Sequence, residues 1–438
     1  MKRKALGLTE LIAIGIGGMI GGGIFSVLGL AVGIAGHAAP VAFAIGSLIA
    51  LAAGYSYVRL ALTYRGDGAS FTYLQHAFPN YPVVAAFTGW TVILGYVGTL
   101  ALYAFTFGAY GADLLGSQEY PAVRVILSAA VLLFFMLINL KGARSSGLTE
   151  DLVVYSKIIL LSLFAVAGLF NIDRDHLVPL FDQGIDRTFM AGALIFVAYE
   201  GFQLITNAVE ETRSPERNIP AGIYGSIIIT SIIYIVLAVV AVGSLAPDEI
   251  ETAKEYALAQ VARPALGETG VILVDSAALL ATSSAINSTL FGASHMIAEI
   301  SSQAMMPRLL SRHTVTHTPW VAVIAMTLLG LLFTGLSGLE VIAVFSSMTF
   351  LLVSIGVSIA NLRLHRETRS HRGLIWLGLV FMIIAITLLP VYLWHNSQDT
   401  LTTIGGLYAV TALSATAYLG FSLSRASTRK PHRDNPDE

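Results

Sequence analysis

The residues that could do chemistry lie in two apolar stretches, and the first of them is rich in glycine. Residues 15–25 read GIGGMIGGGIF, and six of the first nine are glycine. Each glycine costs about 1 kcal/mol relative to alanine inside a helix, so a helix is expected to break here. Peptide groups freed in hydrocarbon must line a cavity or bind something. A second half-helix that begins near Gly23 would point free N–H groups at the membrane midplane, which suits a carboxylate.

A second interruption is expected in the apolar stretch that begins near residue 188. Residues 196–203 read FVAYEGFQ and place Glu200 and Gly201 well inside that stretch. Three interpretations of Glu200 stay open: a protonated acid satisfied by unwound backbone, a counter-charge for an amine or cationic group, or a proton carrier coupled to Lys157. Phe202 follows the break directly. Its ring either closes over a midplane site or packs within the helix bundle.

Lys157 is the one lysine or arginine that the expected topology leaves inside a span. Inserting lysine near a helix centre costs about 2.5 to 3.5 kcal/mol. Its ammonium group either extends to the membrane surface near Glu150 and Asp151, or faces the interior and binds carbonyls of the first span and hydroxyls such as Ser283 or Ser284. In the second case its charge replaces a sodium ion. Because burial disfavours the charged form, the residue could then load and release a proton.

These residues must be positioned by membrane-spanning helices. The 438 residues are 55% hydrophobic and 12% charged, about half the charged fraction of a soluble protein. Since a span needs about 20 apolar residues, we expect an all-α integral membrane protein with about twelve transmembrane helices. These begin near residues 8, 40, 83, 121, 151, 188, 219, 269, 319, 339, 373 and 401. One transmembrane domain, 1–423, and a polar, disordered tail, 424–438, are therefore predicted.

The basic residues predict the orientation. In a twelve-span arrangement, most of the 25 lysines and arginines fall on the side of the N-terminus. The opposite side receives Arg124, Arg174, Arg187, Lys254 and Arg263. Because cytoplasmic loops are enriched in basic residues, both termini are expected in the cytoplasm, in a multi-pass protein of the cell membrane. Membrane lipid is the expected surrounding, and no nucleic-acid partner is expected.

Several chemistries find no support in the residue types. The chain has no cysteine, which excludes disulfides, thiol nucleophiles and thiolate metal sites. Its histidines show no metal-ligand spacing, and no P-loop, serine-elbow or metalloprotease helix motif is present. We therefore expect no enzyme activity, no cofactor and no metal. An ion gradient would have to supply the energy for transport.

The two interruptions lie five spans apart, which is typical of an inverted repeat. Repeat 1 is expected at about 8–171 and repeat 2 at about 187–362, and two additional helices at about 373–423 follow them. In this 5+5 arrangement, with helices 1 and 6 broken, one bundle rocks against a scaffold around a site at the membrane midplane. The outer segment 247–264 alternates charged and apolar residues, and either forms a short surface helix or is a solvated connector.

Three motifs carry a family resemblance. The chain resembles the amino acid–polyamine–organocation permeases, and among them the prokaryotic proton-coupled amino acid transporters with the LeuT-type fold. The motifs are GIGGMIGGGIF at 15–25, YEGFQLITNAVEETRSPERNIPAGI at 199–223 and ATSSAINSTLFGASHMIAE at 281–299. The likeness covers nearly the whole chain. In the second motif, the turn at 214–220 reads as a helix stop and restart.

This resemblance implies a transporter that imports amino acids by alternating access, coupled to protons and independent of sodium. It further implies that the substrate carboxylate meets the N–H groups of Gly21, Gly22 and Gly23. The substrate amino group would meet carbonyls around three residues, Met19, Val197 and Glu200. Lys157 matches a family lysine that occupies the place of a sodium ion, and Ser283 and Ser284 fall in the segment that helps form that place.

Three positions depart from the family pattern. Gly22 replaces a frequent Ser or Thr, Gln203 replaces a frequent Glu, and Glu200 is an acid where members usually have an apolar residue. The last departure suggests selectivity for a cationic amino acid or an amine, or a second protonatable site. Alternative functions are therefore an amine, polyamine or cationic amino acid permease or exchanger, a cation channel or uptake protein on the same scaffold, and a non-transporting nutrient sensor. Oligomeric state stays open.

Overall fold

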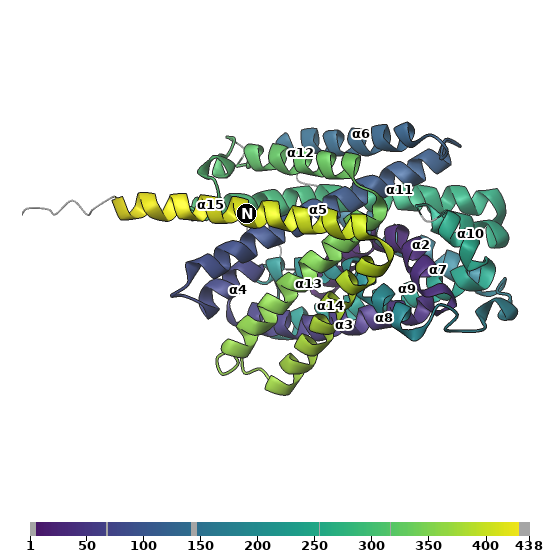
Figure 1. The fold of residues 1–438 in the computed structure, drawn as a ribbon, viewed down its shortest axis with the longest axis horizontal. Helices are drawn as coiled ribbons and strands as arrows, with labels where there is room; N and C mark the ends of the chain where they lie inside the picture. The colour runs from purple at the N-terminus through teal and green to yellow at the C-terminus, as the bar shows by residue number, and fades with distance from the viewer. Residues whose placement is uncertain (1–5, 67–68, 142–146, 254, 316, 429–438) are drawn as a thin grey trace, which may run out of the picture.

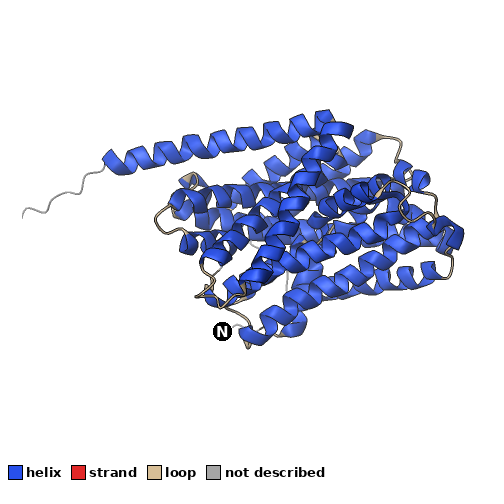
Figure 2. Ribbon diagram, turned by 60° about the horizontal axis from the view of Figure 1, so that its bottom comes forward, coloured by secondary structure: helices blue, strands red, loops and turns tan. Residues whose placement is uncertain are grey.

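The fold is all-α, as expected from the sequence. The computed structural model describes residues 6–66, 69–141, 147–253, 255–315 and 317–428. Within these ranges the chain consists of helices and connecting loops (Figure 2). The β contact found there is an isolated bridge between Leu6 and Thr212. Residues 1–5 and most of the predicted tail, 429–438, lie outside the described ranges.

Each predicted span corresponds to a helix or to two half-helices. In chain order these are α1 (Leu8–Met19) with α2 (Gly23–Ala35), α3 (Ala39–Thr63), α5 (Pro82–Leu114), α6 (Pro121–Leu140), α7 (Gly147–Leu169), α8 (Ile185–Ile195) with the 3-10 helices η3 (Phe196–Ala198) and η4 (Glu200–Ala208), α9 (Pro215–Ser244), α11 (Ala257–Ser302), α12 (Trp320–Leu336), α13 (Leu339–Arg363), α14 (Arg372–Asn396) and α15 (Gln398–Thr428). Two shorter helices, α4 (Ala69–Ala77) and α10 (Pro247–Thr252), connect them.

The helices have the length and composition of membrane spans. In the described ranges, eight helices are long and apolar enough to cross a membrane, and three shorter apolar helices accompany them. In the most apolar stretch of α5, 89% of the residues are buried, whereas the figure for α6 is 22%. Exposed apolar side chains of α6 include Ile126, Phe134 and Leu137. Because such a surface is stable only against lipid, the chain is a multi-pass membrane protein with α5 inside and α6 at the lipid boundary.

The helices form one bundle with two distinguishable ends (Figure 1). The short helix α10 lies at one end, on the right of the view, and α4 lies toward the other. Inside the bundle α5 packs along α11, and α3 packs along α9. The half-helix α1 contacts α9, η4 and α7, and α2 contacts α8. These contacts enclose the broken first helix on several sides.

Helix ends follow local sequence signals. Helix η4 ends at Ala208 and α9 begins at Pro215 after Ser214, whose φ is 51°, so the chain restarts a helix at the start of the predicted segment 214–220 and the rest of that segment lies within α9. Proline fits the first helical turn because the N–H it lacks has no partner there. The outer segment 247–264 is helical in part: it contains α10 and the start of α11, which bends at Gly267 with φ 62°. Helix α15 continues to Thr428, into the segment predicted as a tail.

Candidate functional site

The first span breaks where its glycines cluster. Helix α1 ends at Met19, and the N–H of Ile20 still bonds to the carbonyl of Ile16 at 2.7 Å. In the described part of the chain, the N–H groups of Gly21 and Gly22 bond no backbone carbonyl. Helix α2 then starts at Gly23. The break therefore presents free N–H donors at the N-terminus of a half-helix, an arrangement that favours anions.

The sixth span is interrupted at the predicted place, and its second half has an unexpected form. Helix α8 ends at Ile195, the short η3 follows, and a turn at Tyr199 leads into η4. The nine residues of η4 form a 3-10 helix, whereas 3-10 runs longer than about four residues are uncommon. The second half of the sixth span is therefore wound more tightly than a regular α-helix.

The two interruptions touch each other through glycine. A Cβ atom on Gly201 would lie 2.3 Å from the carbonyl carbon of Gly18 and 2.4 Å from the amide nitrogen of Met19. A Cβ on Gly18 would in turn lie 3.0 Å from the Cα of Gly201. Only glycine allows two backbones to approach this closely. These two glycines therefore fix how near the broken helices lie.

Two tyrosine hydroxyls bind carbonyls at the breaks. Tyr234 of α9 donates to the carbonyl of Met19 at 2.7 Å and lies 3.4 Å from that of Ala198. Tyr103 of α5 lies 3.5 Å from the carbonyl of Gly18. Tyr234 was not among the residues that the sequence singled out. A tyrosine inside an apolar span does carry a signal, because its buried hydroxyl needs a partner.

Lys157 of α7 points into the protein. Its side chain is 1% exposed, and its Nζ atom donates a 3.1 Å hydrogen bond to the carbonyl of Gly17. The ammonium group therefore meets a carbonyl of the first span, and it does not extend to the membrane surface. Ser283 and Ser284 lie half-buried on α11. Ser288, one turn further along α11, lines the cavity described next.

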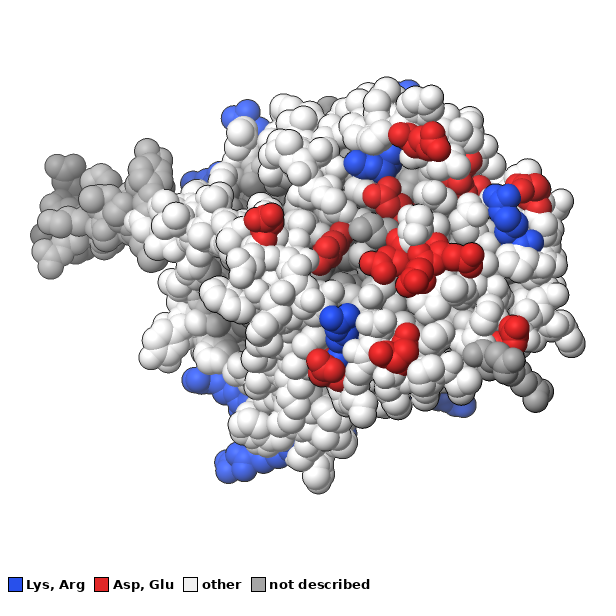
Figure 3. All heavy atoms as spheres, turned by 45° about the vertical axis from the view of Figure 1, so that its right-hand side comes forward, with Lys and Arg blue, Asp and Glu red and all other residues white. Residues whose placement is uncertain are grey.

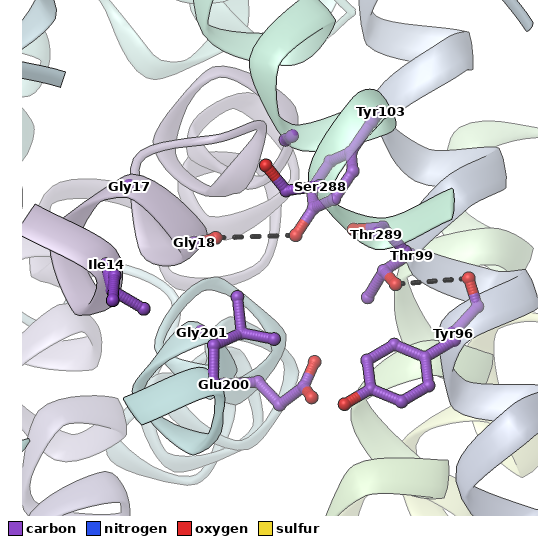
Figure 4. Close-up of a pocket in the computed structure, with 12 residues that line it drawn as sticks. Ile14, Gly17, Gly18, Tyr96, Thr99, Tyr103, Glu200, Gly201, Ser288 and Thr289 are labelled. Atoms are coloured by element: carbon purple, nitrogen blue, oxygen red, sulfur yellow. Dashed lines mark hydrogen bonds between the residues drawn. The ribbon is translucent and has the colours of Figure 1, made fainter. Parts of the chain in front are cut away.

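A small cavity adjoins the two breaks (Figure 4). Its volume is about 40 Å³, room for only a few water molecules. Tyr96, Thr99 and Tyr103 of α5 form one wall, and Figure 4 shows the Glu200 carboxylate directed toward the Tyr96 hydroxyl. The remaining walls come from α1, η4 and α11, through Ile14, Gly17, Gly18, Gly201, Leu204, Ala285, Ser288 and Thr289.

Glu200 is the predicted substrate-site residue that lines this cavity. The other predicted residues are buried but are not among the residues that line the cavity: Met19, Gly21, Gly22, Gly23, Val197 and Phe202. Phe202 packs edge-to-face against Tyr57, with ring centroids 5.4 Å apart. The cavity thus lies beside Gly17 and Gly18, on the α1 side of the break, rather than at the glycines that begin α2.

A bundle of membrane-spanning helices, two of which are interrupted at adjoining points beside a polar cavity, defines a membrane transport protein. Comparison with known families agrees with this class. The amino acid permease family matches residues 6–400. The chain therefore belongs to the amino acid permease family, which confirms the resemblance seen in its motifs.

Individual relatives are similar over most of their length. An inner membrane transport protein of Escherichia coli, YbaT, is 29% identical over 92% of this chain and 94% of its own. The branched-chain amino acid permease BcaP of Bacillus subtilis is 25% identical over 73% of this chain and 72% of its own. The serine/threonine exchanger SteT of the same organism is 25% identical over 84% and 86%.

Proposed function

We propose that the protein is a sodium-independent, proton-coupled transporter that imports amino acids across the cell membrane by alternating access. The observation that carries this proposal is the contact between Lys157 and Gly17. The buried ammonium group of Lys157 lies beside the broken first helix and donates a hydrogen bond to the Gly17 carbonyl. While it is protonated, this ammonium group supplies the positive charge that a bound sodium ion would otherwise supply, so no sodium ion is needed here.

The same contact supports coupling to protons. While it is protonated, Lys157 holds the Gly17 carbonyl and thereby ties α1 to α7. Loss of the proton removes the charge that strengthens this hydrogen bond, so α1 becomes freer to move. We further propose that the hydroxyl groups of Ser283 and Ser284 on α11 contribute to the polar surroundings of the ammonium group. The protonation state of one side chain thus biases the position of the half-helix that leads into the substrate site.

The first break binds the amino acid itself. The N–H groups of Gly21, Gly22 and Gly23 take the substrate carboxylate, and carbonyls around three residues take its amino group: Met19, Val197 and Glu200. The Phe202 ring packs edge-to-face against the Tyr57 ring. An amino acid substrate also fits the relatives, since one is named for branched-chain amino acids and another for serine and threonine.

Transport requires movement of the broken helices. A cavity of about 40 Å³ is too small for most amino acids, so the helices around it must separate to admit one. In the proposed 5+5 arrangement of repeats 8–171 and 187–362, a bundle that contains the broken helices provides this motion by rocking against a scaffold of the other helices. Both termini lie in the cytoplasm. Near the N-terminus, the N–H of Leu6 donates to the carbonyl of Glu211, and the N–H of Arg213 donates to the carbonyl of Leu6, each at 2.8 Å. These two hydrogen bonds link the start of α1 to the segment after η4.

The test is uptake of labelled amino acids into proteoliposomes with an imposed proton or sodium gradient. We expect accumulation with the proton gradient, none with the sodium gradient, and loss of accumulation when a protonophore is added. Liposomes without protein provide the blank. Sodium-driven accumulation would overturn the coupling, and saturable binding without uptake under either gradient would overturn transport.

A further inference from the structure

The side chains that line the cavity at the helix breaks favour a positively charged ligand group. Among the described residues that line it, Glu200 is the only charged side chain, and no lysine or arginine is present. Two tyrosines and three hydroxyl residues, Thr99, Ser288 and Thr289, supply further oxygen atoms. Such a wall offers hydrogen-bond acceptors and one carboxyl group that can carry a negative charge when a cation lies beside it. It suits a cationic ligand group.

The Glu200 carboxylate has no partner of its own. The residue is 5% exposed, and within the described ranges its side chain forms no hydrogen bond or ion pair. Figure 4 shows its two oxygens at the cavity, directed toward the hydroxyl of Tyr96. A buried carboxylate without a cation is expensive, because the free energy of its hydration is lost and nothing replaces it. A cation that enters the cavity would supply the missing interaction.

The tyrosines favour the same ligand. Tyr103 approaches the carbonyl of Gly18 at 3.5 Å, and the Thr99 hydroxyl bonds to the Tyr96 carbonyl at 3.2 Å. The Tyr96 ring itself packs edge-to-face against Phe350, with ring centroids 5.8 Å apart, and both tyrosine rings lie at the wall opposite η4. Aromatic faces attract ammonium and guanidinium groups, most strongly where water is excluded. Both the carboxylate and the rings therefore select for positive charge.

Building on the proposed function, we propose that this cavity binds the positively charged end of the substrate side chain, with Glu200 as its counter-charge. The substrate class is then the cationic amino acids, with an ammonium or guanidinium group at the end of a flexible chain. The two ends of such a substrate have separate places. Its carboxylate lies at the glycines that begin α2, and its side chain extends past Gly201 into the cavity on the α1 side.

The surface charge agrees with a cationic substrate. Figure 3 views the molecule toward the end that carries α10 and shows many acidic and few basic groups there. Exposed acidic residues of the loops and helix ends in this region include Glu119, Asp186, Asp248, Glu249 and Glu251. A surface of one sign raises the local concentration of ions of the opposite sign. In the expected orientation this end faces outward, so it would concentrate cations at the entry side.

The test compares the binding of L-lysine and L-norleucine to the purified full-length protein. Norleucine has a linear alkyl side chain and lacks the terminal amino group of lysine. We expect the dissociation constant for lysine to be at least about 10-fold lower, the size of one charge-assisted hydrogen bond. In Glu200→Gln, which keeps the shape of the side chain, this preference should disappear while norleucine still binds. Glu210→Gln, at an exposed position, is the matched control.

Each outcome has a definite meaning. Wild-type protein that binds norleucine as tightly as lysine overturns the cationic side-chain site but leaves amino acid binding intact. Equal weakening of both ligands in Glu200→Gln would place Glu200 at the α-amino group instead, and also overturns the inference. Binding of neither ligand would count against the proposed function. If Glu200→Gln does not fold, the ratio of the two constants in the wild type still decides.

Discussion

Gly201 and Gly18 meet backbone to backbone: a methyl group on Gly201 would stand 2.3 Å from the carbonyl carbon of Gly18. The contact joins the second interrupted helix to the first. Since carbon atoms in ordinary contact lie about 3.5 to 4.0 Å apart, no side chain fits between these residues. The geometry of both breaks therefore depends on two residues that contribute no side-chain chemistry.

Replacing Gly201 with Ala should separate the two breaks. The added methyl forces the backbones apart, and overpacking of this kind costs about 1 to 3 kcal/mol. We expect a lower midpoint of thermal unfolding and loss of amino acid uptake. Gly292→Ala in α11 is the matched control, because a Cβ there meets no atom within 4 Å. Wild-type uptake by Gly201→Ala would show that the close approach is not needed for transport.

Replacing Lys157 with Ala should abolish uptake driven by a proton gradient. In the part of the chain that the structure describes, the Lys157 Nζ atom of α7 donates a hydrogen bond to the Gly17 carbonyl. The substitution removes this hydrogen bond together with the charge of the ammonium group. Uptake is to be measured in proteoliposomes over a range of external pH. Lys141→Ala, at an exposed position, should keep the wild-type profile. Full activity with unchanged pH dependence in Lys157→Ala would remove this residue from the coupling mechanism.

Replacing Gly22 with Leu should prevent substrate binding. A Cβ on Gly22 would lie 2.4 Å from the Tyr103 ring, so the larger side chain must displace that ring or fill the break. We expect binding too weak to detect by calorimetry, with the helical circular dichroism spectrum retained. Gly335→Leu in α12 has open space around its Cβ and should bind normally. Normal affinity in Gly22→Leu would argue against a carboxylate site at the first break.

Replacing Tyr234 with Phe should loosen the link between the two breaks. The variant keeps the ring but loses the hydroxyl that donates to the Met19 carbonyl at 2.7 Å. A buried carbonyl left without its partner costs about 1 to 3 kcal/mol. We expect a lower unfolding temperature and weaker amino acid binding. Tyr120→Phe, whose side chain is 64% exposed, should change neither, and an unaltered Tyr234→Phe would mean that another donor replaces the hydroxyl.

The sequence by itself determined the architecture, because the signals for it are local. Long apolar stretches predict the spans, and the glycine run at 15–23 predicts the first break, which occurs between Met19 and Gly23. Glycines at this density make an unbroken helix costly, although Gly15, Gly17 and Gly18 still lie within α1. The family followed from the same local motifs. The sequence also placed one lysine, Lys157, within the fifth span.

Only the tertiary structure decided which groups meet. The sequence left two places open for Lys157, and packing of α7 against α1 brings its Nζ to the Gly17 carbonyl. Tyr234 reaches Met19 across 215 positions of the chain. The position of the cavity, at Glu200 and Gly18 rather than at Gly22, depends likewise on how α5 and η4 approach α1. Hydropathy and glycine content act along the chain, but hydrogen bonds and cavities depend on distances between helices, which no local pattern encodes.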